Sequence, residues 1–177
     1  ARRGVADYRS TTRDVRRLLN DLNGKIDGLV LNLRENGGGS LQEAEDLTGL
    51  FIGDGPVVQV RQSDGDVEVE KDNEPAPVYT GPLAVLVDHA SASASEIFAG
   101  AIQDYGRGIV IGDPTFGKGT VQTLVDLNRL TRAKDPQGQL KMTIAKFYRV
   151  NGSSTQHRGV QPDIAIPSAV DSAETGE

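Results

Sequence analysis

Ser93 is the strongest candidate for a chemically active side chain, because it lies where a predicted strand passes into a predicted helix. It lies in a run of small residues between the apolar segment 83–88, typical of a buried strand, and apolar residues that recur at helical spacing from Ile97 onwards. This pattern predicts a helix N-terminus at or just after Ser93, where free backbone N–H groups and the helix dipole favour negative charge. Ser93 is therefore a candidate nucleophile, and the N–H of Ala94 is a candidate donor to an oxyanion.

A serine hydroxyl is a weak nucleophile that needs a base, and Lys118 is the best-placed candidate. It lies between two glycines in the loop after the next predicted strand. A lysine can act as a base only when burial lowers its pKa from about 10.4, and the glycines would let the chain approach Ser93 closely. The two histidines are predicted to be structural, since His89 directly follows a strand and His157 lies in a polar segment. A serine–lysine pair is a variant of the catalytic triad.

A second oxyanion donor is predicted in the glycine loop that begins at residue 37, at Gly38 or Gly39. This loop also lies between a predicted strand and a predicted helix N-terminus, and we expect it at the same edge of the sheet as Ser93. Glycine would let the backbone come close to a substrate and adopt a positive φ.

Each of these residues also has an ordinary structural interpretation. A lysine between glycines is commonly an exposed loop tip, and serines are commonly turn or capping residues, so residue types alone leave both interpretations open. The segment 112–118 also matches most of a phosphate-binding loop, but that motif needs Ser or Thr where Gly119 stands, and a helix after it. The strand-like residues 120–125 argue against nucleotide binding.

The spacing of apolar residues predicts alternating strands and helices in the middle of the chain. We expect helices over 12–23, 41–51 and 97–106, strands over 26–33, 83–88, 108–113, 120–125 and 140–150, and a hairpin that turns at 63–66. Crossovers of this kind predict an α/β fold with a mixed, largely parallel sheet flanked by helices. The hairpin and the polar segment 71–77 after it are interpreted as a surface excursion.

The 177 residues suit one domain, predicted to span 1–167, with a disordered tail at 168–177. The net charge of −6, with no separate basic stripe, predicts no nucleic-acid surface. Cysteine is absent, which excludes a thiol nucleophile, disulfides and a cysteine-built zinc site. No apolar run approaches the roughly 20 residues of a membrane span, and residues 1–4 lack the apolar stretch of a signal peptide.

Several segments, in one order, resemble a known family. They are 28–39 (GLVLNLRENGGG), 91–97 (SASASEI) and 112–122 (GDPTFGKGTVQ), followed by 146–152 (KFYRVNG) and 159–164 (GVQPDI). They look like the C-terminal processing proteases and, among these, the bacterial tail-specific branch. The resemblance covers roughly residues 8–167, and three motifs in the same order are more specific than a lone pattern.

The resemblance implies roles for particular residues. Ser93 would be the nucleophile, Lys118 the general base and Gln122 a partner that orients the lysine. Asp104 stands at a position implicated in activity in this family, where its role could be structural. The family also implies a fold related to crotonase and no metal or organic cofactor.

The resemblance further implies protein or peptide substrates, unfolded or tagged, that are cleaved near apolar C-termini in the periplasm or cell envelope. Family members usually have a PDZ domain that captures substrate C-termini, and none is evident here. A strand expected before the first helix is not visible in residues 1–7. The alternative hypothesis is therefore a non-catalytic peptide-binding or scaffold domain on the same fold.

Overall fold

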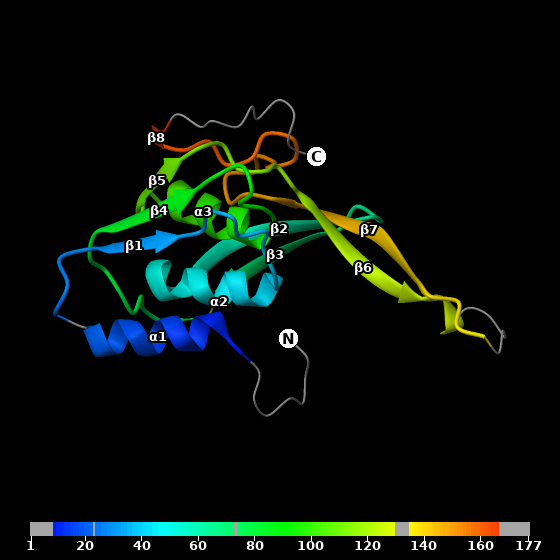
Figure 1. The fold of residues 1–177 in the computed structure, drawn as a ribbon, viewed down its shortest axis with the longest axis horizontal. Helices are drawn as coiled ribbons and strands as arrows, with labels where there is room; N and C mark the ends of the chain where they lie inside the picture. Colours follow the sequence, from blue (N-terminus) through cyan, green and yellow to red (C-terminus); the bar gives the residue numbers. More distant parts are fainter. Residues whose placement is uncertain (1–8, 23, 73, 130–134, 167–177) are drawn as a thin grey trace.

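The computed structural model describes residues 9–22, 24–72, 74–129 and 135–166 (Figure 1). In chain order the elements are α1 (Thr11–Leu22), β1 (Leu29–Asn32), α2 (Leu41–Ile52), β2 (Gly55–Gln62), β3 (Val67–Asp72), β4 (Leu83–Val87), α3 (Ala94–Asp104), β5 (Ile109–Gly112), β6 (Thr120–Asp126), a 3-10 turn (Leu127–Arg129), β7 (Gln139–Tyr148) and β8 (Ile164–Ala165). The predicted tail at 168–177 and the segment 1–7 lie outside the described residues.

Helix α2 illustrates how the local sequence sets the helix ends. Ser40 is its N-cap, and Ser40 Oγ accepts a hydrogen bond from Glu43 N at 3.4 Å. Gly53, with a φ of 73°, follows the last helical residue and donates its N–H to Gly49 O. The capping pattern thus predicted the start of this helix correctly.

Four parallel strands form one sheet, in the order β1-β4-β5-β8 (Figure 1). Because these strands are parallel, the loops that follow β1, β4 and β5 all leave the same edge of the sheet. The three loops contain Gly38, Ser93 and Lys118, respectively. The topology therefore collects at one edge the segments that sequence reasoning singled out.

The remaining four strands form a separate antiparallel sheet, in the order β3-β2-β7-β6. The predicted α/β class is confirmed, but parallel and antiparallel pairing are divided between two sheets. The interpretation of the hairpin as a surface excursion is wrong for β2, because Val57, Val58 and Val60 are buried. These valines pack on α2 and α3 through residues such as Ala44 and Ile97. The local sequence does not show which distant helix will cover a strand.

Helices α2 and α3 lie between the two sheets and contribute to a hydrophobic core on each side (Figure 1). Phe51 of α2 and Phe98 of α3 meet edge to face on the side of the parallel sheet, with ring centroids 5.7 Å apart. That core also contains Leu19, Leu33, Leu47, Leu50, Leu83, Val85, Val87, Ala99, Ile102, Val110 and Val160. The helices that position the site are thus held from both faces.

The outer face of the parallel sheet is apolar and is not covered by the described part of the chain. Val30, Ile109 and Ile164 lie on three different strands and are 61%, 48% and 51% exposed. The continuous apolar runs predicted strands buried on both faces. The described helices cover only one face, so half of that apolar pattern points outward.

Glu45 is a buried carboxyl on α2, with only 4% of its surface exposed. Burial raises its pKa from 4.5 to about 7, and the nearby acidic residues Glu70, Asp46 and Asp72 add to this effect. The folded protein therefore holds a proton on Glu45 at pH values where the unfolded chain has released it.

We expect Glu45→Gln to remove a pH dependence of stability. Because the pKa of Glu45 is raised on folding, its contribution to stability is fully present below about pH 4.5 and is lost as pH rises through about 7. Urea unfolding at about pH 5 and pH 8 should show the wild-type free energy of unfolding falling by about 2 kcal/mol more than that of the variant. An equal fall in the two proteins would contradict this expectation.

Candidate active site

Ser93 lies on a strained turn between β4 and α3. It is the N-cap residue of α3, and its φ of 58° and ψ of −113° are rare for a residue other than glycine. Such a backbone conformation costs about 1–3 kcal/mol and persists only where the surroundings enforce it, as happens at active sites. A nucleophilic serine on a sharp strand-to-helix turn is a recurrent arrangement in hydrolases.

The turn is held by a carboxylate that lies wholly inside the protein. Glu96, on the first turn of α3, has no exposed surface, and its Oε2 accepts from Ser93 N at 2.7 Å. The same oxygen accepts from Lys118 N at 3.0 Å. Its other oxygen, Oε1, accepts from Thr115 Oγ1 at 2.6 Å and from Gly117 N at 2.8 Å. One side chain thus joins the turn of the candidate nucleophile to the loop of the candidate base.

Lys118 is partly buried in a loop that packs against a second stretch of backbone. A Cβ added to Gly117 would lie 3.1 Å from the backbone of His157, and one added to Gly119 would lie 2.9 Å from Gln156 N. The flanking glycines therefore accommodate this neighbouring turn, whereas the sequence suggested that they give room beside the serine. The Lys118 ammonium makes no hydrogen bond or ion pair with the described residues.

The glycine loop lies directly against the serine turn. Gly38 has a φ of 96°, and a Cβ there would lie 2.5 Å from Ala92 O and 2.8 Å from Ala94 N. The Gly38 N–H donates to Asn36 Oδ1 at 3.0 Å. The N–H groups of Gly39 and Ala94 have no acceptor in the described ranges, which leaves both able to bind an oxyanion.

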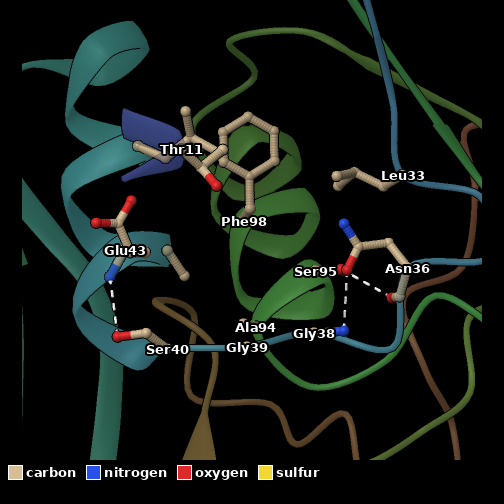
Figure 2. Close-up of a pocket in the computed structure, with 12 residues that line it drawn as sticks. Thr11, Leu33, Asn36, Gly38, Gly39, Ser40, Glu43, Ala94, Ser95 and Phe98 are labelled. Atoms are coloured by element: carbon tan, nitrogen blue, oxygen red, sulfur yellow. Dashed lines mark hydrogen bonds between the residues drawn. The ribbon is translucent and has the colours of Figure 1, made fainter. Parts of the chain in front are cut away.

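A pocket of about 210 Å³ opens beside this loop (Figure 2). Gly38, Gly39 and Ala94 line one side of it, so the candidate oxyanion donors and the pocket share a boundary. Ser95 Oγ donates to Asn36 O at 2.9 Å and fixes the loop on α3. The apolar lining is made by Leu33, Ala44, Leu47 and Phe98.

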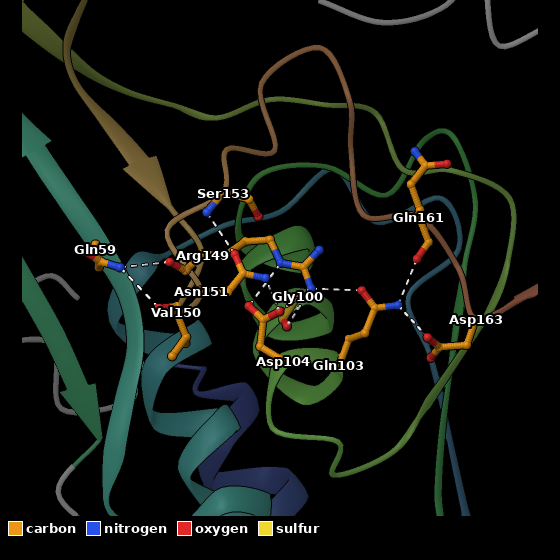
Figure 3. Close-up of polar contacts among 10 residues, drawn as sticks. All are labelled: Gln59, Gly100, Gln103, Asp104, Arg149, Val150, Asn151, Ser153, Gln161 and Asp163. Atoms are coloured by element: carbon orange, nitrogen blue, oxygen red, sulfur yellow. Dashed lines mark hydrogen bonds and ion pairs between the residues drawn. The ribbon is translucent and has the colours of Figure 1, made fainter.

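Asp104 lies at the opposite end of α3 from Ser93, a helix about 16 Å long. Its carboxylate accepts from Arg149 Nη2 at 2.6 Å and from Asn151 Nδ2 at 2.7 Å (Figure 3). The Asp104 and Arg149 side chains are 7% and 14% exposed. Arg149 also donates to Gly100 O, so the ion pair fastens the C-terminal end of α3 to the turn after β7. The structure does not bring Asp104 to the serine.

Gln122 is exposed on β6, where it is paired with Thr143. Its side-chain amide forms no hydrogen bond with the part of the chain that the structure describes, so it is not joined to Lys118 in this structure. No group of three or more His, Cys, Asp or Glu side chains within the described ranges could hold a metal ion. None of the helices formed by the described residues has the length and apolar content needed to cross a membrane.

The profile of the family described as Peptidase family S41 matches residues 5–166. The chain belongs to this family. A tail-specific protease of Haemophilus influenzae is 53% identical to the S41 chain over 172 residues, which are 96% of this chain and 25% of that protein. A carboxy-terminal-processing protease of Bartonella bacilliformis is 39% identical over 153 residues, which are 80% of this chain and 31% of that protein.

Solved structures share the fold of the S41 chain. The photosystem II D1 C-terminal processing protease superposes with a TM-score of 0.78 at 30% identity, over 93% of this chain and 42% of that one. A lipoprotein from Streptococcus agalactiae has the same fold at 16% identity, with a TM-score of 0.68 over 88% of this chain and 57% of that one. The resemblance to the C-terminal processing proteases is confirmed, and the chain spans a quarter to a third of the length of the two relatives described above.

Sequence reasoning did not single out Glu96 or Thr115. A signal for Glu96 was present, because it stands three residues after Ser93, the same capping-box spacing that identified the start of α2. Thr115 had no such signal, since its hydroxyl reaches α3 only through the tertiary fold.

We expect Gly38→Ala to lower peptide hydrolysis by about 100-fold or more, because a Cβ there collides with the serine turn and displaces it. The matched control is Gly37→Ala, since a Cβ at Gly37 meets nothing within 4 Å. Initial rates on an unfolded protein substrate measure the effect. Equal rates for the two variants would show that the close approach of Gly38 does not matter.

Asp104→Asn is expected to act through stability, because it leaves the poorly exposed Arg149 guanidinium without its carboxylate. Breaking such a pair costs about 3 kcal/mol, whereas Asp14→Asn, in an exposed ion pair with Arg13, should cost less than about 1 kcal/mol. Urea unfolding measures both values. Hydrolysis well below the melting temperature should stay within a few-fold of wild type, and a stable but inactive variant would contradict the structural role.

Proposed function

We propose that this S41 chain is the catalytic core of a serine endopeptidase, with Ser93 as nucleophile and Lys118 as general base. The observation that carries the proposal is that the backbones of both residues donate to one oxygen atom, Glu96 Oε2. The strained turn at Ser93 and the lysine ammonium, which has no carboxylate partner among the described residues, support the same assignment.

In the proposed reaction, the side-chain amine of Lys118 takes the proton from Ser93 Oγ as that oxygen attacks the carbonyl carbon of the substrate. The carbonyl oxygen becomes an oxyanion, stabilised by the N–H groups of Ala94 and of Gly39 or Gly38. Gly39 is the more accessible of the two, because Asn36 already accepts from Gly38. The lysine then protonates the leaving amine, the C–N bond breaks, and water activated by the lysine hydrolyses the acyl-serine ester.

Gln122 is the proposed partner that orients Lys118, on the strength of the family resemblance. Gln122 lies on β6, four residues after Lys118 in the sequence. A glutamine amide oxygen can accept a hydrogen bond from an ammonium group. The relation to the crotonase fold and catalysis without a metal or organic cofactor stay predictions on the same basis.

The proposed substrates are unfolded or tagged proteins or peptides, cut near an apolar C-terminus. The apolar pocket beside the oxyanion donors supports this, since it could take an apolar substrate side chain next to the scissile bond. The names of the relatives, tail-specific and carboxy-terminal-processing proteases, favour the same substrates. From the resemblance we also propose a periplasmic or envelope location and substrate capture by a PDZ domain elsewhere in the protein.

A non-catalytic peptide-binding domain is the alternative. The pocket alone favours it, because an apolar pocket binds a side chain whether or not the serine is activated. This alternative predicts peptide affinity without turnover at any protein concentration.

Ser93→Ala and Lys118→Ala should each lower kcat/KM by about 1,000-fold or more, because each removes one half of the proposed dyad. The matched control is Lys141→Ala, which removes an exposed lysine of β7 and should leave the rate unchanged. Fragments of an unfolded protein with an apolar C-terminus are followed by mass spectrometry, with the natural full-length protein as enzyme. Cleavage by either dyad variant at the wild-type rate would overturn the proposal, and binding without cleavage by wild type would favour the alternative.

A further inference from the structure

Glu96 makes more contacts than a helix cap requires. A capping glutamate needs only the N–H of its N-cap residue, which is here Ser93. Glu96 additionally accepts from Thr115, Gly117 and Lys118, which lie on the loop after β5. No lysine, arginine or histidine side chain of the described residues bonds to it. Its contacts therefore serve to join two segments of the site, beyond starting the helix.

The two contacts of Oε2 restrict the distance between the candidate nucleophile and the candidate base. Ser93 N lies 2.7 Å from this oxygen and Lys118 N lies 3.0 Å from it. Two nitrogen atoms that donate to one oxygen can lie no farther apart than the sum of the two hydrogen-bond lengths, so the shared oxygen sets an upper limit on their separation. The backbone positions from which both side chains extend are therefore held near one atom, Glu96 Oε2.

The hydrogen-bond directions require Glu96 to accept at all four contacts. Three of the donors are backbone N–H groups, which can only donate. The fourth is the Thr115 hydroxyl, which accepts from Val160 N at 2.7 Å and has its own hydrogen available for Glu96 at 2.6 Å. A glutamine at position 96 would place an NH₂ group against two donors.

Burial and hydrogen bonding have opposite effects on the pKa of the Glu96 carboxyl. Burial raises the pKa of Glu96 above its ordinary value, and the hydrogen bonds from Thr115, Ser93, Gly117 and Lys118 offset only part of this rise. The donors thus offset part of the cost of burying a charge. An acceptor kept buried at this cost, without a cation beside it in the described residues, is expected to have a function beyond packing.

We propose that Glu96 is a positioning residue, whose carboxylate fixes the separation and orientation of Ser93 and Lys118. It acts on the chemical step and leaves substrate binding to the pocket and the glycine loop. This inference rests on the proposed serine–lysine mechanism.

The first test is the kinetics of Glu96→Gln in the natural full-length protein. A displacement of about 1 Å between reacting groups costs about 100-fold, so kcat should fall by about that factor while KM stays within about threefold. The matched control is Glu45→Gln, which alters another buried glutamate on α2 and should leave kcat within about twofold. A kcat for Glu96→Gln equal to that of wild type would overturn the proposal, as would an equal loss in the control.

A second pair of variants keeps the test valid if Glu96→Gln does not fold. Thr115→Val removes one donor to Oε1 with little change in shape, and Thr115→Ser retains the hydroxyl. We expect kcat to fall about tenfold in Thr115→Val and to recover to within about threefold of wild type in Thr115→Ser. Equal values of kcat for the two variants would overturn the proposed positioning role.

A third measurement is independent of activity. Amide hydrogen exchange at Ser93, Gly117 and Lys118 should be at least about tenfold faster in Glu96→Gln than in wild type, and unchanged in Glu45→Gln. Unchanged exchange at all three amides would overturn the proposal that Glu96 holds the two segments together. Faster exchange together with full activity of Ser93→Ala would instead overturn the proposed serine mechanism, and Glu96 would still be shown to join the two segments.

Discussion

The positive φ of Ser93 persists because its N–H is bound from inside the fold by Glu96 Oε2. The same carboxylate oxygen accepts from Lys118 N, so the strained turn and the lysine loop cannot relax independently. Burial without any exposed surface removes competing water from these hydrogen bonds. The site thus depends on one anion that is held by backbone N–H groups and a hydroxyl.

Helix α3 connects this anion to the rest of the molecule. Its N-terminal end carries Ser93 and Glu96 and lies at the edge of the parallel sheet, among the loops after β1 and β5. Its C-terminal end is fastened through Asp104 and Arg149 to the turn after β7 of the antiparallel sheet. The helix is buried between the two cores, so both sheets determine where the serine lies.

Much of this architecture could be predicted from the sequence because it depends on short-range patterns. Apolar runs identified β4 and β5, and the spacing of Ser40 and Glu43 identified the start of α2. The burial of Val57 and Val60 could not be predicted, because α3, which covers them together with the neighbouring α2, lies far along the sequence. The structural requirement for glycine at position 117 could not be predicted either, because the His157 backbone that leaves no room for a Cβ there is distant along the chain.

The sequence by itself determined the residue types of the site, the strand–loop–helix context of Ser93 and membership of a protease family, because each is written in contiguous motifs. Only the tertiary structure decided that Gly38 lies against the serine turn, that Asp104 serves the far end of α3, and that Glu96 joins serine to lysine. The physical reason is that parallel strands bring distant loops to one edge, where hydrogen bonds between those loops fix positions that no local pattern encodes.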